Sequence, residues 1–341
     1  MYDSKIDSSE INCIVMMKAI TRKTYGGPNV LTLQSVPKPV PKANELLVRV
    51  RYTTVNRTDC GILTGKPFLI RFFTGLPKPS SPIPGTDFSG EVVGVGEKVK
   101  RFSVGDRVWG LNDEGLASHA EFMVIKETKA VDLIPEGVSY DQAVACAEGG
   151  HYAYNFINKV ALSKGDKVLV NGATGAIGSA ALQILKSRGV FVTAVGNTKN
   201  MTLLKKLGAD KVYNYEKEDF TELDELQYNC VFDAVGKSSF KKCKRLLLPK
   251  GIYISSELGP NAENLYLPIL TYIKGGKRVI FPIPKNCKES IEYLNNLLEA
   301  KKYVPVIDRN YAPEEIKSAY EYVQSAQKTG NVLIDFTASE S

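Results

Sequence analysis

One stretch near the middle of the chain predicts its architecture: Asn171-Gly172-Ala173-Thr174-Gly175-Ala176-Ile177-Gly178. It follows the apolar segment 167–170, and residues 176–188 continue with apolar side chains at helical spacing. A tight turn between a strand and a helix brings backbone N–H groups close to a pyrophosphate, whose negative charge the helix dipole favours. The stretch therefore predicts a dinucleotide-binding turn, although Ala173 stands where the usual fingerprint has its first glycine. A glycine turn without a ligand is the alternative.

The segments after this turn alternate between strand and helix up to about residue 281. Repeated βαβ units require right-handed crossovers and predict a parallel, doubly wound sheet, the Rossmann fold. Residues 16–140 instead contain short strands separated by turns. We therefore expect an α/β chain in which a Rossmann domain, 141–301, is inserted into a split, β-rich domain made of 16–140 and 302–341. Residues 1–15 would form an extension.

The tail carries a further amphipathic helix. Pro313 is followed by Glu314 and Glu315, which is typical of a helix start. The side chains expected on its buried face are Ile316, Ala319, Tyr320 and Val323.

The composition is that of a globular protein. Charged residues make up 24% of the 341 residues and hydrophobic residues 43%, which excludes a disordered or fibrous chain. No run of about 18 apolar residues occurs, so the sequence predicts no membrane span. The first fifteen residues contain three acids and no apolar core, unlike a secretory signal. The formal net charge of +7 suits an anionic ligand or cofactor.

The cysteines, histidines and basic residues narrow the functional classes. The six cysteines are scattered without a Cys-x-x-Cys pair, so we expect a reduced, cytoplasmic chain rather than a disulfide framework or a structural zinc site. The only histidines are His119 and His151, which excludes a histidine-rich metal centre. The densest basic run, 241–245, falls on an expected helix. A solvated helix face is the first interpretation there, and nucleic-acid binding is the alternative.

The strand after the turn indicates which dinucleotide binds. An NAD site has Asp or Glu about 20 residues beyond the turn, where it accepts hydrogen bonds from the ribose. Here the strand 192–195 runs into Gly196-Asn197-Thr198-Lys199-Asn200, which contains no acid. Asn197 and Thr198 offer hydrogen-bond donors, and Lys199 offers a positive charge to a 2′-phosphate. The segment therefore favours NADPH over NADH. A solvated Lys199 near a helix start is the alternative.

Several motifs, taken in order, resemble those of one family. They are Met17-Lys18-Ala19-Ile20, Val55-Asn56-Arg57-Thr58-Asp59, the segments 83–92 and 99–108, the turn at 171–178, Leu207-Gly208-Ala209-Asp210 and Asp233-Ala234-Val235-Gly236. Together they resemble medium-chain dehydrogenase/reductases, specifically the zinc-independent, zeta-crystallin-like quinone oxidoreductase branch. The resemblance covers about residues 17–336 and implies that the split, β-rich domain is a GroES-like catalytic domain.

The resemblance also locates the ligand positions of the catalytic zinc in other members of the family. These positions carry Asn56, the pair Thr86-Asp87 and, near the third, Glu148. One carboxylate does not make a tetrahedral N/S site, so no metal is expected. The resemblance implies NADPH-dependent transfer of hydride to quinones or activated alkenes, such as enones and alkenals, which spread the incoming charge without a metal. It also implies a homodimer that pairs through the nucleotide domains.

Three further cofactor residues follow from the resemblance. Tyr215 matches a position beside the adenosine phosphate. Leu258 lies in a stretch that matches the lining of the cofactor cleft. Asn331, like Lys328, matches a tail that is close to the cofactor in relatives.

Asn56, Tyr52 and His151 are the candidate catalytic residues. Asn56 matches a position near the nicotinamide, where it could donate a hydrogen bond to cofactor or substrate, or else cap a turn. Tyr52 could donate a proton, or only pack in a half-buried strand. His151 follows Glu148 by three residues at an expected helix start, so the two could form a proton relay. A neutral, packed His151 is the alternative.

The leading hypothesis is therefore a cytoplasmic, NADPH-dependent reductase of quinones or activated alkenes. Two alternatives stay open: an NAD(P)-dependent alcohol dehydrogenase of the same fold, and a non-enzymatic NADPH-binding module of the zeta-crystallin type. The apolar stretch 67–76 could cover a substrate pocket, contact a membrane or another subunit, or pack over the core.

Overall fold

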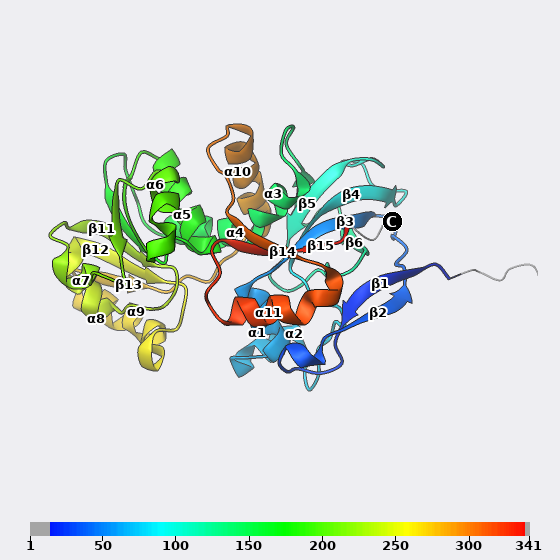
Figure 1. The fold of residues 1–341 in the computed structure, drawn as a ribbon, viewed down its shortest axis with the longest axis horizontal. Helices are drawn as coiled ribbons and strands as arrows, with labels where there is room; N and C mark the ends of the chain where they lie inside the picture. Colours follow the sequence, from blue (N-terminus) through cyan, green and yellow to red (C-terminus); the bar gives the residue numbers. More distant parts are fainter. Residues whose placement is uncertain (1–13, 338–341) are drawn as a thin grey trace, which may run out of the picture.

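The computed structural model describes residues 14–337, which form two halves that lie side by side (Figure 1). One half is built around a six-stranded sheet and the other around a seven-stranded sheet. Of the expected N-terminal extension, 1–15, residues 1–13 lie outside the described part. Across residues 14–337, no helix combines the length and the apolar character that a membrane span requires.

The nucleotide half contains an entirely parallel sheet with the strand order β10-β9-β8-β11-β12-β13. Its strands are β8 (Lys167–Asn171), β9 (Phe191–Gly196), β10 (Lys211–Asn214), β11 (Tyr228–Asp233), β12 (Leu247–Ser255) and β13 (Arg278–Ile280). From β8 the chain first builds outward through β9 and β10, and then crosses to β11 on the other side of β8. The carboxyl end of β8 is therefore the point at which the strand order reverses, where such sheets bind their ligands. The predicted doubly wound sheet is confirmed.

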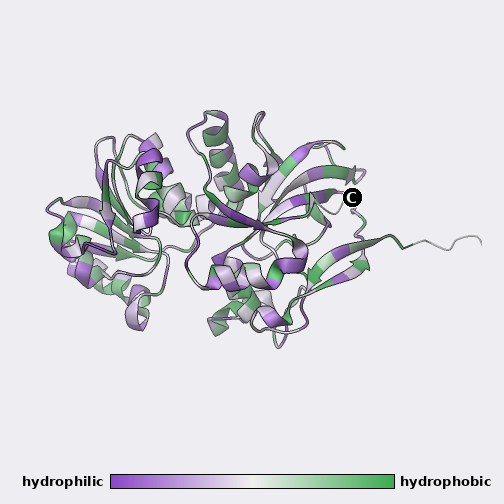
Figure 2. Ribbon diagram, in the orientation of Figure 1, coloured by the Kyte–Doolittle hydropathy of each residue, from purple (hydrophilic) through white to green (hydrophobic). Residues whose placement is uncertain are grey.

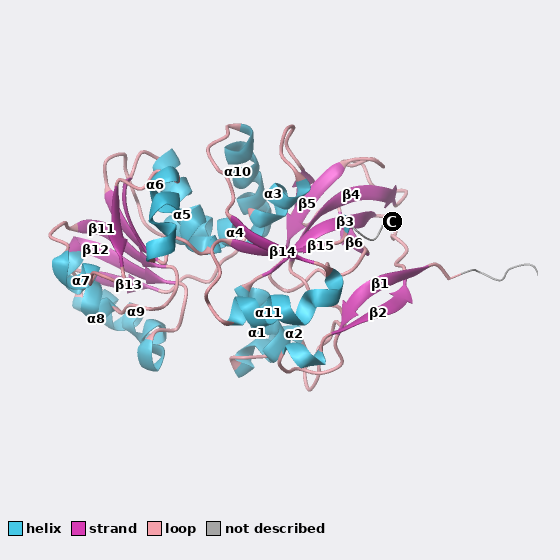
Figure 3. Ribbon diagram, in the orientation of Figure 1, coloured by secondary structure: helices cyan, strands magenta, loops and turns pink. Residues whose placement is uncertain are grey.

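Helices cover both faces of this sheet (Figure 3). They are α4 (Ala147–Ile157), α5 (Ala176–Ser187), α6 (Met201–Lys206), α7 (Phe220–Leu223), α8 (Phe240–Cys243), α9 (Glu263–Lys274) and α10 (Cys287–Glu299). The main core lies between the sheet and α4, α5 and α10. There Val168 and Val170 of β8 pack with Leu182 and Leu185 of α5 and with Leu294 of α10.

The β-rich half is built on a sheet with the order β14-β15-β3-β4-β5-β7, and β6 also pairs with β3. Its strands are β3 (Glu45–Val55), β4 (Asp87–Val95), β5 (Arg107–Leu111), β6 (Phe122–Lys126), β7 (Val131–Leu133), β14 (Ile307–Tyr311) and β15 (Asn331–Asp335). A separate hairpin-like pair is formed by β1 (Met16–Thr21) and β2 (Thr32–Pro37). β14 and β15 come from the end of the chain, so the predicted split of this domain is visible in its sheet. The boundaries at 140/141 and 301/302 stay predictions.

Four α-helices complete the β-rich half: α1 (Arg57–Thr64), α2 (Arg71–Thr74), α3 (Tyr140–Ala145) and α11 (Ile316–Gln324). Short 3-10 helices occur at Pro28–Val30, Phe68–Ile70, Thr198–Asn200, Lys244–Leu246, Pro260–Ala262 and Pro313–Glu315. The four apolar side chains predicted for the buried face of α11 are all buried. Hydrophobic and hydrophilic residues alternate along the helices, as expected of helices that bury one face (Figure 2).

Candidate active site

The glycine turn lies at the carboxyl end of β8 and leads directly into α5. Gly172 has a φ of +75°, in the left-handed region that favours glycine. A Cβ on Gly178 would lie 2.2 Å from the Gly172 carbonyl oxygen, so α5 can begin this close to the turn only with glycine at 178. The helix begins after Gly175, which provides no side-chain cap. The first-turn N–H groups of α5 are therefore free of a side-chain cap, and the turn fits a bound pyrophosphate.

The tail of the chain closes onto this turn. The Gly330 N–H donates to the Thr174 carbonyl at 2.7 Å, and Gly175 and Gly330 form a parallel bridge. Asn331 follows at once and is buried, but its side-chain amide donates to the Val306 carbonyl at 3.0 Å. The predicted cofactor residue Asn331 thus lies beside the turn, where its amide holds β14 and β15 together.

The segment after β9 contains Asn197, Thr198 and Lys199, the three residues expected to contact a 2′-phosphate. Asn197 accepts a hydrogen bond from the Asn200 side chain at 2.8 Å. Lys199 is exposed, with its Nζ 3.5 Å from the Gln327 carbonyl. Tyr215 is 55% exposed at the same edge of the sheet. This edge is open to solvent and offers the positive charge of Lys199 and the aromatic ring of Tyr215.

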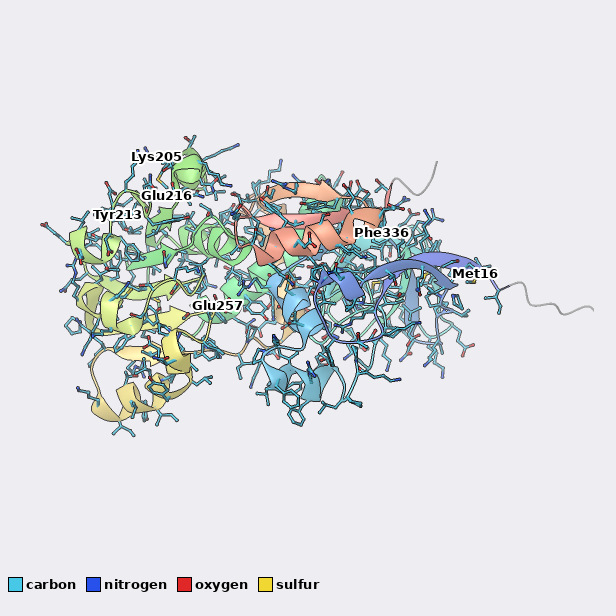
Figure 4. The ribbon with its side chains drawn as sticks, turned by 60° about the horizontal axis from the view of Figure 1, so that its bottom comes forward. Met16, Lys205, Tyr213, Glu216, Glu257 and Phe336 are labelled. Carbon is cyan, nitrogen blue, oxygen red and sulfur yellow. The ribbon has the colours of Figure 1, made fainter. Side chains whose placement is uncertain are left out.

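The expectation that no acid lies at the end of β9 is corrected by the structure. The carboxylate of Glu216 accepts hydrogen bonds from the Thr198 N–H at 3.0 Å and from the Thr198 hydroxyl at 2.6 Å. Those hydrogen bonds lower the pKa of Glu216, so the group is charged. Glu216 follows β10, whose end pairs with the end of β9 through Asn214 and Gly196. The segment 196–200 itself contains no acid, but the folded chain places the Glu216 carboxylate against it (Glu216 is labelled in Figure 4).

Asn56 caps α1 and is almost fully buried. Its Oδ1 accepts a hydrogen bond from the Asp59 N–H at 2.8 Å, and the Asp59 carboxylate accepts one from the Asn56 N–H at 3.2 Å. Its Nδ2 donates to the hydroxyls of Thr86 at 2.9 Å and Thr54 at 3.1 Å. Both amide hydrogens of Asn56 therefore have partners inside the protein, and the geometry supports the capping interpretation.

Asn56 and its hydrogen-bond partners Thr54, Thr86 and Asp87 form what we call the corner around Asn56. The donor atoms of this corner do not fit the catalytic zinc of related dehydrogenases. Asn56 and Thr86 present an amide nitrogen and a hydroxyl, whereas zinc sites use thiolate, imidazole and carboxylate ligands. Asp87 accepts hydrogen bonds from the Thr54 N–H at 2.7 Å and from the Thr54 hydroxyl at 2.6 Å. Burial raises the pKa of Asp87 to about 6, while these hydrogen bonds oppose the rise. The carboxylate is thus held as part of the frame that supports Asn56.

Glu148 places a buried carboxyl group at the junction of the two halves. It lies in the first turn of α4 and is buried. The Thr58 hydroxyl, on α1, donates to Glu148 Oε1 at 3.1 Å, and the Tyr152 hydroxyl lies 3.1 Å from Thr58 Oγ1. Burial raises the pKa of Glu148 to about 7, and the positive charge of Lys328 limits the rise. Glu148 can therefore both give and take a proton near neutral pH.

Tyr52 lies apart from this cluster. On β3 it stands opposite Asp335 of β15, and it packs with Val144, Ala145 and Leu333. Burial and the charge of Asp335 raise the pKa of its hydroxyl. This placement supports the packing interpretation of Tyr52.

His151 is fully buried and uses both ring nitrogens away from Glu148. Its Nε2 lies 3.0 Å from Asp113 Oδ2, and its Nδ1 lies 2.8 Å from Ser290 Oγ. Burial lowers the pKa of His151, but hydrogen bonds and charge interactions with Asp113 and Cys287 outweigh this effect and raise it to about 9. His151 is therefore charged at neutral pH, not neutral as in the packed alternative.

The stretch after β12 reaches across to the β-rich half. Arg57, the first residue of α1, forms an ion pair with Glu257, with 2.9 Å between Nη2 and Oε1. Glu257 lies between the two halves of the molecule in Figure 4, and Leu258 follows it. Leu258 is therefore at the domain junction, and its contact with a cofactor stays a prediction.

Sequence reasoning missed Glu216, Thr58 and Tyr152. Thr58 is the second residue of α1 and belongs to the motif that carries Asn56, so its place in that motif was a signal in the sequence. Glu216 and Tyr152 gave no signal, because their partners lie on other elements.

Comparisons with known proteins agree with this fold. Residues 42–154 match the alcohol dehydrogenase GroES-like domain family, and residues 207–334 match the zinc-binding dehydrogenase family. The chain is 30% identical to a 2-methylene-furan-3-one reductase from Solanum lycopersicum, over 96% of this chain and 81% of that protein. It is 31% identical to the chloroplast envelope quinone oxidoreductase homolog of Arabidopsis thaliana, over 94% of this chain and 98% of that protein.

Solved structures give the same result. The quinone oxidoreductase from Coxiella burnetii superimposes with a TM-score of 0.83 at 26% identity, over 94% of this chain and 99% of that chain. The chain is thus an NAD(P)-dependent oxidoreductase that belongs to the medium-chain dehydrogenase/reductase family, in its zinc-independent quinone oxidoreductase branch.

Proposed function

We propose that this enzyme uses NADPH to reduce quinones or α,β-unsaturated carbonyl compounds without a catalytic metal. The observation that carries the proposal is the corner around Asn56, where the amide of Asn56 and the hydroxyl of Thr86, joined by a hydrogen bond, stand at positions of zinc ligands. Without a Lewis acid, a simple carbonyl loses several kcal/mol of charge stabilisation in the transition state. Quinones and conjugated enones tolerate this loss because they delocalise the incoming charge. Relatives named quinone oxidoreductase and alkenal/one oxidoreductase support the same substrate class.

The glycine turn holds the cofactor in this proposal. Gly172 to Gly178 and the first turn of α5 would hold the pyrophosphate, and the residues at the end of β9 would hold the adenosine ribose. When bound, NADPH supplies a hydride. The ion pair between Arg57 and Glu257 connects the β-rich half with the stretch after β12.

Glu148 supplies the proton that accompanies the hydride. Its pKa of about 7 gives a protonated fraction at neutral pH. Thr58 donates a hydrogen bond to Oε1, and this hydroxyl in turn can accept one from Tyr152, so the carboxyl is held in a fixed orientation. Burial raises the pKa of Tyr152, which stays protonated and acts as a positioning residue. Solvent reprotonates Glu148 after each turnover.

NADPH oxidation measured over a panel of quinones, enones, simple aldehydes and ketones tests the proposal. We expect turnover of quinones or enones that is unchanged by a chelator. Activity confined to simple aldehydes and ketones and lost on chelation would overturn it in favour of an alcohol dehydrogenase. NADPH binding without turnover on any substrate would favour a non-enzymatic module.

The preference for NADPH rests on Lys199, with Asn197 and Tyr215 at the same edge. We expect Lys199→Gln to weaken NADPH binding about 10-fold and to leave NADH binding unchanged, since only NADPH carries the 2′-phosphate. Lys205→Gln on α6 is the matched control, because it removes one exposed positive charge from the helix that follows this segment. An equal loss of affinity for both dinucleotides in Lys199→Gln would contradict the assignment.

We further propose that the protein is a cytoplasmic homodimer that pairs through the nucleotide half. β13 is an edge strand with β12 as its single neighbour. The adjacent helix α9 exposes large apolar side chains: Leu265, Tyr266, Ile269, Leu270, Tyr272 and Ile273. A second copy that covers this face would remove a patch too apolar for an isolated surface and complete the edge of the sheet.

A further inference from the structure

Asp113, His151 and Cys287 bring three metal-ligating side chains to one point. We propose that they form a zinc-binding site. Within residues 14–337, this is the one group of at least three such side chains whose ligand atoms all lie within 4.8 Å of one another. The site is separate from the corner around Asn56, where related dehydrogenases hold their catalytic zinc. The inference goes beyond the proposed function and does not depend on it.

The distances suit a tetrahedral zinc ion. His151 Nε2 lies 3.0 Å from Asp113 Oδ2 and 3.8 Å from Cys287 Sγ. Zinc bonds of about 2.0 Å to nitrogen and oxygen and about 2.3 Å to sulfur, at tetrahedral angles, require about 3.3 Å between N and O and about 3.6 Å between S and N. Each of these two pairs therefore has to move by only a few tenths of an ångström, and the ligand atoms of Asp113 and Cys287 lie within 4.8 Å of each other. The fourth position is left for water.

The imidazole of His151 is already oriented for metal binding. Its Nδ1 lies 2.8 Å from Ser290 Oγ, whose hydroxyl donates toward the Asn286 carbonyl at 3.4 Å. Ser290 can therefore accept the Nδ1 proton, which leaves Nε2 as the ligand atom. The Asn155 amide donates to Ser290 Oγ at 3.2 Å and to the His151 carbonyl at 3.0 Å. A hydrogen bond that fixes the second ring nitrogen is typical of metal-binding histidines.

The charges favour an ion at this point. Oδ1 of Asp113 is buried and has no hydrogen-bond partner among the described residues. A divalent ion bound by the Asp113 carboxylate, the Cys287 thiolate and neutral His151 has no net charge, which suits a largely buried position. Binding releases the thiol proton of Cys287 and the Nε2 proton of His151 to solvent.

The three ligands come from separate parts of the fold. Asp113 lies in the loop after β5, His151 on α4, and Cys287 is the first residue of α10. One ion would therefore tie the β-rich half to two packed helices of the nucleotide half. Glu148 lies one turn before His151 on α4, so the ion would also stiffen the helix that carries this carboxyl group.

Metal titration of the full-length protein tests the site. After removal of metals with a chelator, zinc affinity is measured in competition with a chromophoric chelator. We expect one zinc ion per chain, and cobalt(II) should produce thiolate-to-cobalt charge-transfer absorption in the near ultraviolet. Asp113→Asn and Cys287→Ser should each weaken zinc binding by at least about 10-fold, and Cys287→Ser should abolish the absorption band.

Glu114→Gln is the matched control, because Glu114 is an exposed acid adjacent to Asp113. It should change zinc affinity less than about twofold, as expected for a solvated charge outside the ligand set. Circular dichroism in the presence of chelator verifies that each variant is folded. Less than one ion per chain, unchanged affinity in both Asp113→Asn and Cys287→Ser, or a cobalt complex without the thiolate band would overturn the proposal.

Discussion

The Glu216 carboxylate accepts hydrogen bonds from both the backbone N–H and the side-chain hydroxyl of Thr198. These are donors that a 2′-phosphate would use at the end of β9. The acid and the phosphate therefore compete for the same groups, and Lys199 has to offset the repulsion between them. We therefore expect the balance of Glu216 and Lys199 to affect cofactor preference.

Glu216→Gln should tighten NADPH binding by about 3- to 10-fold, because it removes a like charge a few ångströms from the phosphate. NADH affinity should stay within about twofold, since NADH carries no charge there. Dissociation constants from cofactor fluorescence check this. Glu218→Gln, an exposed acid in the same segment, serves as the control and should have a smaller effect. Equal gains for both cofactors would contradict the assignment.

Glu148→Gln should change the pH profile of turnover. The protonated carboxyl is the active form, so kcat of the native enzyme should fall as pH rises through about 7. The variant should be slower and lack this titration. Thr58→Val removes a hydrogen bond that lowers the pKa of Glu148, so its midpoint should move to higher pH. A variant with the native midpoint would show that another group titrates.

Glu148→Gln should also change how the free energy of unfolding depends on pH. The pKa of Glu148 is raised by burial from the usual 4.5 to about 7, so folding favours the protonated form. The contribution of Glu148 to the free energy of unfolding is thus largest below about pH 4.5 and is lost as pH rises to about 7. Glu148→Gln should be more stable than the native chain at pH 8, by up to about 3 kcal/mol, and the two should converge in acid. Urea unfolding at both pH values measures the difference.

Two glycines of the turn should respond differently to alanine. In Gly178→Ala the new Cβ meets the Gly172 carbonyl oxygen at 2.2 Å, so backbone must move and stability should fall by about 2 kcal/mol or more. In Gly175→Ala the nearest atom is 3.7 Å away, so the fold should tolerate the change. Thermal unfolding compares the pair. If the stable Gly175→Ala variant binds NADPH more weakly, this loss would indicate that a phosphate of the cofactor lies close to the turn.

Ile273→Glu should convert the proposed dimer to a monomer. Ile273 is 77% exposed on α9, within the apolar face beside β13, and a charge buried there in a dimer would have no partner. Val40→Glu is the control, because Val40 is 83% exposed in the β-rich half. Light scattering after gel filtration gives the mass of each. A native chain that is already monomeric would refute the dimer.

Much of the fold could be predicted because its signals are local. The turn at 171–178 is short, and the helix that begins at Pro313 shows its buried face through spacing alone. The parallel sheet follows from the repeated strand–helix pattern. These features depend on residues close in sequence, which a single chain displays directly.

The site was less predictable because its contacts join distant segments. His151 pairs with Asp113, 38 residues earlier, and lies near Cys287, 136 residues later. Glu148 receives its hydrogen bond from Thr58, 90 residues earlier. No periodicity links such positions, so only the packing of α4 against neighbouring elements could show which side chains meet.

The pairing of β15 with β3 has a consequence for biosynthesis. All six strands of the nucleotide sheet lie between residues 167 and 280 and leave the ribosome as one uninterrupted run. β3, by contrast, emerges early and waits for residues 331–335 to occupy one of its edges. The nucleotide half can therefore assemble before β15 is synthesised, whereas the β-rich half closes only after residues 331–335 have emerged. A premature stop before residue 331 would leave an intact cofactor domain attached to an open sheet prone to aggregation.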